Sequence, residues 1–334
     1  MAAYDIHTHD YDVVVVGAGG AGLRATLGMA EQGLRTACVT KVFPTRSHTV
    51  AAQGGIAASL SNMGPDNWQW HMYDTVKGSD WLGDTDAMEY LAREAPKAVY
   101  ELEHYGVPFS RTEEGKIYQR AFGGMTRNFG EGPVQRTCAA ADRTGHAMLH
   151  TMYGQSLRHA AEFFIEFFAI DLIMDDQGVC RGVIALKLDD GTLHRFRAQT
   201  TILATGGYGN VYHMSTLAKN SNASALMRAY ELGAFMASPS FVQFHPTGLP
   251  VNSTWQSKTI LMSESLRNDG RIWSPKKEGD DRDPNTIPEE ERDYFLERRY
   301  PAFGNLVPRD VASRAISQQI NAGLGVGPLH NSVY

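Results

Sequence analysis

The stretch "YDVVVVGAGGAG", residues 11–22, decides the fold. Four consecutive valines are typical of a buried strand in a parallel sheet, and a GxGxxG pattern follows them directly. The next segment, residues 23–33, has the pattern of a helix. In a strand–turn–helix unit, such glycines allow a tight turn and let a pyrophosphate approach the amino end of the helix. We therefore predict a dinucleotide-binding α/β fold, with a purely structural glycine turn as the alternative; the turn residues are Gly17, Gly19, Gly20 and Gly22.

Composition narrows the class of protein. A chain of 334 residues with 43% hydrophobic residues predicts two globular domains. Its 31 basic and 37 acidic residues are interleaved, which gives no basic surface for nucleic acid. No apolar run reaches the roughly 18 to 20 residues that span a bilayer, and the start "MAAYDIHTHDYD" lacks signal-peptide features. We expect a cytosolic chain, or one held to a membrane by partners.

The three cysteines lie far apart and form no CxxC pair. This spacing predicts neither a disulfide framework nor a ligand set for an iron–sulfur cluster. No metal site is expected from the sequence.

The second predicted strand, residues 35–40, lacks the terminal acid that binds an adenosine ribose in the NAD fingerprint. Thr40 and Lys41 stand there instead, and this pair does not decide between NAD and FAD. The loop "PTRSHTVAAQGG", residues 44–55, follows where the redox ring of a dinucleotide would lie, and its small residues would let the backbone approach a flat ring. We expect cofactor contacts from Thr40, Lys41, Ser47, His48, Thr49, Gln53, Gly54 and Gly55.

Downstream patterns extend the α/β fold. Residues 84–106 carry apolar side chains at helical spacing, which predicts a core-packing helix through Met88, Leu91, Ala95, Val99 and Leu102. A second helix is expected within residues 147–162. Strands over 163–174, 179–188 and 193–198 form a predicted meander. The strand "TTILATGG", residues 200–207, then returns to the parallel sheet and brings Thr205 and Gly206 to the nucleotide.

Five stretches together resemble the flavoprotein subunit of succinate dehydrogenase and its relative fumarate reductase. They are GAGGAG, RSHTVAAQGG, QRAFGG at 119–124, ATGGYG and FVQFHPTG at 241–248. The resemblance implies a Rossmann-like FAD-binding domain with a β-meander over 1–246 and an inserted α+β capping domain over 247–334. It also implies that this capping domain is incomplete, because family members continue past residue 334 with a second substrate histidine and arginine.

The resemblance assigns His48 a covalent role. In that family the histidine of RSHT is bonded to the 8α carbon of FAD, and His48 matches it by motif. The alternative is a histidine that only hydrogen-bonds within its loop. The stretch "SNAS" at 221–224 departs from the Gly-Asp-Gly contact to FAD in one branch of the family, and Asn222 and Ser224 are expected to cap a helix there.

The resemblance also implies a dicarboxylate site. His245, in FHPTG, matches the substrate-binding histidine, and Phe122, in QRAFGG, is assigned to substrate binding. "LMSESLRNDGR", residues 261–271, stands where the family has TEGCRGEGG, so Ser263 and Glu264 match its Thr-Glu pair. Arg309 matches the arginine that donates a proton to fumarate, with Glu264 and Arg267 as its relay. For each arginine a surface salt bridge is the alternative.

These matches imply oxidation of succinate to fumarate with covalently bound FAD. Electrons would pass to an iron–sulfur subunit and to quinone through membrane anchor subunits. The implied location is peripheral, on the cytoplasmic face of the inner (plasma) membrane. Two alternatives stay open: a truncated FAD-binding polypeptide without turnover, and an L-aspartate oxidase-like enzyme, which holds its flavin non-covalently.

Overall fold

The computed structural model describes residues 5–251, 253, 255–256 and 259–334. Residues 1–4, the start of the stretch without signal-peptide features, lie outside the described residues. The chain forms two compact units that interleave along the sequence: the first takes 1–52, 104–107 and 145–239, and the second takes 53–103, 108–144 and 240–334. The predicted division into domains 1–246 and 247–334 stays a prediction.

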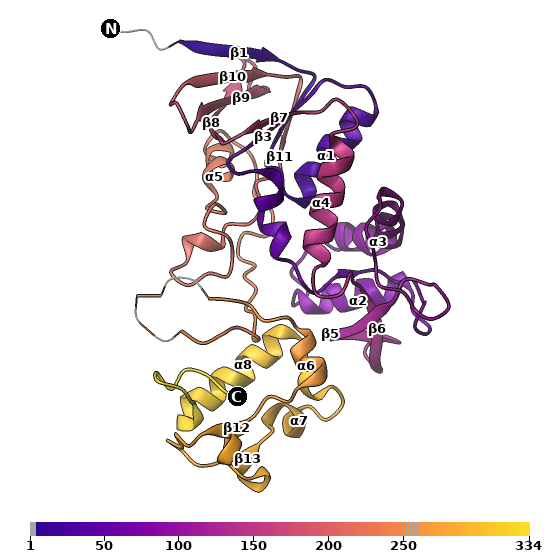
Figure 1. Cartoon of the computed structure of the whole chain (residues 1–334), viewed down its shortest axis with the longest axis vertical. Coiled ribbons are helices and arrows are strands. Elements are labelled where there is room, and N and C mark those ends of the chain that lie inside the picture. The colour runs from indigo at the N-terminus through magenta and orange to yellow at the C-terminus, as the bar shows by residue number, and fades with distance from the viewer. Residues whose placement is uncertain (1–4, 252, 254, 257–258) are drawn as a thin grey trace. The chain divides into compact units, whose positions relative to one another are not determined.

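A parallel sheet forms the centre of the first unit. Its order is β11-β2-β3-β7, with every neighbouring pair parallel. The helix α1 (Gly20–Glu31) follows β2 and packs on this sheet (Figure 1). The four valines of β2 are at most 5% exposed, as expected for a central strand. The predicted Rossmann-like α/β arrangement is confirmed, with strands β2 (Val13–Val16), β3 (Thr36–Thr40), β7 (Glu162–Ile165) and β11 (Thr200–Leu203).

A second sheet contains the predicted meander. Its order is β1-β10-β9-β8, and the unexpected strand β1 pairs in parallel with β10. The prediction of one strand over 163–174 is wrong, because Glu166 has a positive φ of 64° and turns the chain between β7 and β8. The first half therefore joins the parallel sheet. The strands are β1 (Ile6–Asp10), β8 (Phe167–Met174), β9 (Cys180–Lys187) and β10 (Leu193–Arg197).

One core joins these two sheets. It combines side chains of β2 and β3, such as Val14 and Val39, with Phe167 of β8 and Phe196 of β10. The first unit also contains the helix α5 (Ser224–Glu231) and most of the helix α4 (Thr144–Ser156). The residue at the amino-terminal cap of α5 is Ala223, not Asn222 or Ser224, although the Asn222 Oδ1 accepts a 3.4 Å bond from the Ser224 N–H.

The second unit has its own antiparallel sheet, ordered β4-β6-β5. The helix α2 (Trp68–Gly78) packs on β5, and α3 (Thr85–Tyr105) is the long helix predicted from the sequence. Leu91, predicted to be in the core, is 52% exposed, because the buried stripe of α3 runs through Ala92, Val99 and Leu102. The strands are β4 (Ile56–Ala57), β5 (Gln119–Arg127) and β6 (Gly132–Cys138).

A small helical layer forms the rest of the second unit. Phe295, Leu296, Val307, Ala312 and Ala315 make up its core. The mixed charge run at 276–299 is largely paired on the surface, as in the 2.7 Å bridge between Arg298 and Asp293. Its elements are α6 (Ser265–Asp269), β12 (Ser274–Pro275), β13 (Arg292–Asp293), α7 (Phe295–Arg299), α8 (Arg309–Gln319) and a π-helical turn (Ile320–Leu324).

Among the described residues, no helix combines the length and the apolar character needed to cross a bilayer. In the same part of the chain, no group of three or more His, Cys, Asp or Glu side chains is arranged to hold a metal ion.

Candidate active site

The glycine turn between β2 and α1 is too crowded for side chains. A Cβ on Gly17 would lie 2.4 Å from the Ala204 carbonyl oxygen, and one on Gly22 would lie 1.7 Å from the Gly17 carbonyl oxygen. Gly17 also has a φ of +106°, which favours glycine. Gly19, at the amino-terminal cap of α1, provides no side-chain hydrogen bond to the helix. Backbone N–H groups at the start of α1 therefore remain suited to bind a pyrophosphate.

The loop after β3 lies against this turn. The Gly20 N–H donates a 3.0 Å bond to the Thr49 Oγ1, and a Cβ on Gly19 would come within 2.8 Å of the Ser47 Oγ. His48 begins a short 3₁₀ turn and is half-buried. Its Nδ1 accepts a 3.1 Å bond from the Ala218 N–H. The structure thus brings Ser47, His48 and Thr49 together with the glycine turn, within the first unit.

Thr40 and Lys41 make contacts inside the first unit. The Thr40 hydroxyl donates to the Val42 carbonyl at 2.8 Å. The Lys41 Nζ donates to the Asn220 carbonyl at 2.6 Å and to the Asn222 Oδ1 at 3.1 Å, and burial lowers the pKa of Lys41. Lys41 therefore anchors the segment that departs from the family pattern, a link that the sequence analysis missed.

At the far end of β11, Gly206 has a φ of +77°, where glycine is favoured. Thr205 precedes it, directly after Ala204, whose N–H bonds to the Val16 carbonyl at the end of β2. The predicted cofactor contacts of Thr205 and Gly206, like those of Thr40 and Lys41, stay predictions.

Gln53, Gly54 and Gly55 belong to the second unit, where local packing already requires them. The Arg120 Nε donates to the Gly54 carbonyl at 2.9 Å, and its Nη2 donates to the Gln53 carbonyl at 3.0 Å. A Cβ on Gly54 would lie 2.7 Å from the Phe122 ring. Their predicted cofactor contacts stay predictions beside this packing role.

A buried carboxylate in the second unit binds two arginines. Glu264 and Arg267 are each 2% exposed. The Glu264 Oε1 pairs with the Arg267 Nη2, and the Oε2 accepts from the Arg309 Nε at 2.8 Å and pairs with its Nη2 at 2.7 Å. Burial, and then the charge of Arg309, lower the pKa of Arg267. The predicted relay residues therefore lie in direct contact, and the cluster carries a net positive charge.

Further contacts fix the two guanidinium groups. The Arg267 Nη1 donates to the Asn305 and Val307 carbonyls, each at 3.1 Å. The Arg309 Nη1 donates to the Gln243 Oε1 at 2.9 Å. The sequence analysis did not single out Gln243, although it lies within the FVQFHPTG motif that indicated His245.

His245 and Phe122 belong to the same cluster. Burial, and then the charge of Arg309, lower the pKa of His245 to about 4, so the ring is neutral at physiological pH. Its Nδ1 accepts a 3.2 Å bond from the Thr247 N–H, which leaves the proton of the neutral ring on Nε2. His245 is therefore a hydrogen-bond donor rather than a cation. The Arg309 guanidinium lies 5.6 Å from the centre of the Phe122 ring, within cation–π range.

Ser263 lies next to Glu264, but its hydroxyl donates to the Asp142 Oδ1 at 2.9 Å. Asp142 also forms a 2.8 Å ion pair with Arg120. The structure therefore places the Ser263 hydroxyl on a carboxylate that the sequence analysis did not single out, and its predicted contact with substrate stays a prediction.

The fold and the glycine turn define a dinucleotide-binding protein. Comparison with known protein families shows which dinucleotide this is. A family model described as FAD binding domain matches residues 12–333. The chain therefore belongs to the FAD-binding domain family. The crowded turn and the start of α1 fit FAD, because Gly19 places no side chain over the first turn of the helix, where backbone N–H groups would bind its pyrophosphate.

Named relatives confirm the resemblance found in the motifs. The mitochondrial succinate dehydrogenase [ubiquinone] flavoprotein subunit of Oryza sativa subsp. japonica is 54% identical over 334 residues, which is 100% of this chain and 50% of the relative. The succinate dehydrogenase flavoprotein subunit of Rickettsia felis is 56% identical over 99% of this chain and 52% of its own length. A solved chain of E. coli quinol fumarate reductase has a TM-score of 0.80 at 34% identity, covering 96% of this chain and 52% of that one. The chain spans about half the length of the curated relatives it matches.

Proposed function

We propose that this chain is the flavoprotein component of a succinate dehydrogenase or fumarate reductase, which interconverts succinate and fumarate. Its similarity to succinate dehydrogenase flavoprotein subunits supports this function. The observation that carries the proposal is a buried carboxylate, that of Glu264, shared by Arg267 and Arg309. The Arg309 side chain is 27% exposed, whereas that of Glu264 is 1% exposed, so Arg309 is the member of this pair that a substrate can reach.

The charge of the cluster suits a dicarboxylate. Two guanidinium groups and one carboxylate leave an excess positive charge, which attracts a substrate carboxylate. The neutral His245 adds a hydrogen-bond donor, and Phe122 offers an apolar face for the carbon chain between the carboxylates. These side chains would orient the substrate with its carboxylates on polar groups.

The same contacts suit proton transfer. Removing a proton from succinate, or adding one to fumarate, needs a group beside the substrate carbon, and microscopic reversibility gives both directions to one group. Arginine is an unusual base because its pKa exceeds about 12. Arg309 touches Glu264, which touches Arg267, so a proton gained or lost at Arg309 would be shared along this buried chain.

FAD, when bound, supplies the acceptor for the hydride. We propose that His48 holds it covalently, in agreement with the RSHT motif. The His48 Nδ1 accepts the Ala218 N–H, a bond that would orient the imidazole for this attachment. Electrons would leave toward an iron–sulfur subunit and membrane anchor subunits, with the protein on the cytoplasmic face of the inner membrane.

A dye-coupled assay with the flavin-loaded protein tests the activity. Turnover of succinate but not of L-aspartate is expected, and flavin binding without turnover would overturn the proposal. The tether is tested separately by mass spectrometry of a tryptic digest. The peptide containing His48 should carry the mass of FAD, less one hydrogen from the methyl group and one from the imidazole; an unmodified peptide from yellow protein would contradict the covalent bond.

A further inference from the structure

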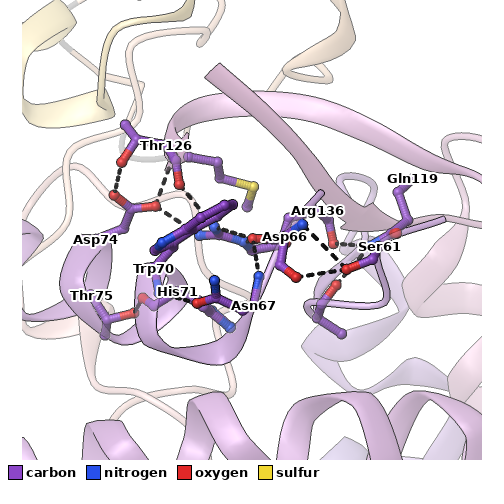
Figure 2. A network of polar contacts seen from close by, with 12 residues as sticks. Ser61, Asp66, Asn67, Trp70, His71, Asp74, Thr75, Gln119, Thr126 and Arg136 are labelled. Atoms are coloured by element: carbon purple, nitrogen blue, oxygen red, sulfur yellow. Dashed lines mark hydrogen bonds and ion pairs between the residues drawn. The ribbon is translucent and has the colours of Figure 1, made fainter. Parts of the chain in front are cut away.

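A second buried arginine lies in the same unit as Glu264, on strand β6. Arg136 is 0% exposed and donates two bonds to Asp66, from Nε at 3.0 Å and from Nη2 at 2.8 Å (Figure 2). Its Nη1 donates to the Asp74 Oδ2 at 2.7 Å, and its Nη2 also donates to the Thr126 carbonyl at 3.0 Å. All three guanidinium nitrogens are therefore bonded.

These contacts end at an irregular part of β5. Pairing between β5 and β6 shifts register at Ala121 and resumes at Thr126, so residues 122–125 bulge out of the ladder. Thr126 closes the bulge, and the Asp74 carboxylate binds both its N–H, at 2.7 Å, and its hydroxyl. Before the bulge, Gln119 donates from Nε2 to the Arg136 carbonyl at 3.1 Å. Arg136 thus binds β5 on both sides of the bulge, through its carbonyl at Gln119 and through its guanidinium at Thr126.

The bulge carries the residues that meet the Glu264 cluster. Phe122 lies beside Arg309, as described above. A Cβ on Gly123 would lie 2.7 Å from the Val307 carbonyl oxygen and 3.0 Å from the Glu264 Oε1. The backbone of the bulge is therefore in contact with the carboxylate that holds both arginines. A shift of Thr126 would move this backbone against Glu264.

We propose that Asp74, Thr126 and Arg136 form a positioning unit that holds the β5 bulge, and through it Phe122 and Glu264, in the geometry that a dicarboxylate substrate requires. The proposal rests on the proposed function. Asp74 and Thr126 touch no reacting group, so they are positioning residues. Asp66, on the opposite side of Arg136, binds the same guanidinium, and the bonds described for its side chain do not reach the bulge.

This asymmetry supplies a matched pair of variants. Asp74→Asn and Asp66→Asn each remove one buried charge beside Arg136, but only Asp74→Asn weakens the grip on Thr126. In the assembled holoenzyme, kcat/KM for succinate should fall about tenfold or more in Asp74→Asn, because small misplacements of reacting groups are costly. In Asp66→Asn it should stay within about twofold of the unmodified enzyme when the losses in Tm are similar.

A second pair of variants makes smaller changes, so that the proposal stays testable if Asp74→Asn does not fold. Thr126→Val keeps the shape but removes the hydroxyl, whereas Thr126→Ser keeps the hydroxyl. Thr126→Val should weaken binding of malonate, a dicarboxylate that cannot form the double bond, and Thr126→Ser should restore it. Amide hydrogen exchange over residues 119–127 should quicken in Asp74→Asn and Thr126→Val only.

Two results would overturn the positioning unit. One is a loss of kcat/KM that follows Tm equally in all four variants, which would show a purely structural role. The other is faster exchange in the bulge with unchanged kcat/KM. If the unmodified holoenzyme binds flavin but does not turn over succinate, the proposed function fails, and the exchange and malonate measurements still decide whether the unit positions the bulge.

Discussion

The second unit buries two arginines in opposite electrostatic settings. Arg136 is bound by two carboxylates, Asp66 and Asp74, so its surroundings carry an excess negative charge. Arg267 shares one carboxylate, Glu264, with Arg309, so this cluster as a whole carries an excess positive charge. Burial alone lowers the pKa of an arginine, but the bonds to Asp66 and Asp74 raise that of Arg136, whereas the pKa of Arg267 stays lowered. The surplus charge marks the Arg267 cluster as the one suited to an anion.

The largest expected effect comes from removing the exposed cation of the positive cluster. Arg309→Gln should lower kcat/KM for succinate by about 10² to 10⁴-fold, the range typical of a lost acid–base group, while flavin content stays unchanged. Steady-state assays on flavin-matched samples measure this loss. Arg314→Gln on the same helix is the control, because Arg314 is exposed and pairs only at the surface with Asp310. Equal losses of kcat/KM in Arg309→Gln and Arg314→Gln would show that Arg309 has no special role in turnover.

The next effect compares the two buried arginines directly. Arg136→Met leaves two carboxylates buried without their cation and should lower the free energy of unfolding by about 3 to 5 kcal/mol. Arg267→Met should cost less, about 1 to 3 kcal/mol, because Glu264 keeps Arg309 as its partner. Urea denaturation of both variants at pH 7 measures the difference. A larger loss in Arg267→Met would reverse the electrostatic comparison.

A further effect, limited to acidic pH, concerns the histidine near each cluster. Burial, and then the charge of Arg136, lower the pKa of His71 to about 4 from its ordinary 6.5. As the pH falls below 6.5, the unfolded chain therefore takes up a proton before the folded chain does. Stability present above pH 6.5 should be lost toward pH 4, by up to about 3 kcal/mol from this group.

His71→Gln, which does not titrate, should flatten this acid dependence between pH 7.5 and pH 4.5. The difference in unfolding free energy between the variant and the unmodified protein, measured across that range, isolates His71 from the carboxylates. Parallel curves would show that His71 is not held neutral. His245, whose pKa is also about 4, is the matching position beside Arg309, where the same substitution should change substrate affinity as well.

The nucleotide-binding region was largely predictable from the sequence because its signals are local. Gly17, Gly19 and Gly22 stand within one turn of chain, between a run of valines and a helix, and the structure has the same order. His48 was singled out in the loop directly after β3, and its role in holding the flavin, assigned through the family motif, stays a prediction. The error at Glu166 was also local: an apolar run gives no sign of a single residue with positive φ.

The charged clusters were less predictable because their members come from distant parts of the chain. Glu264 and Arg309 are separated by 45 positions, and Arg136 and Asp66 by 70. No spacing rule connects such residues, so Glu264 and Arg309 were assigned only through family motifs. Arg136, Asp74 and Asp142 stood in no quoted motif and were missed.

The parallel pairing of β1 with β10 has a consequence for synthesis of the protein. Asp10 and Arg197, 187 positions apart, face each other at the end of this pair. During translation, β1 has no β10 to pair with until Arg197 has left the ribosome, so the backbone hydrogen-bonding groups that β10 will bind stay unpaired. Such delayed closure exposes nascent chains to aggregation. Molecular chaperones that cover this N-terminal edge should therefore improve the yield of folded protein in the cell.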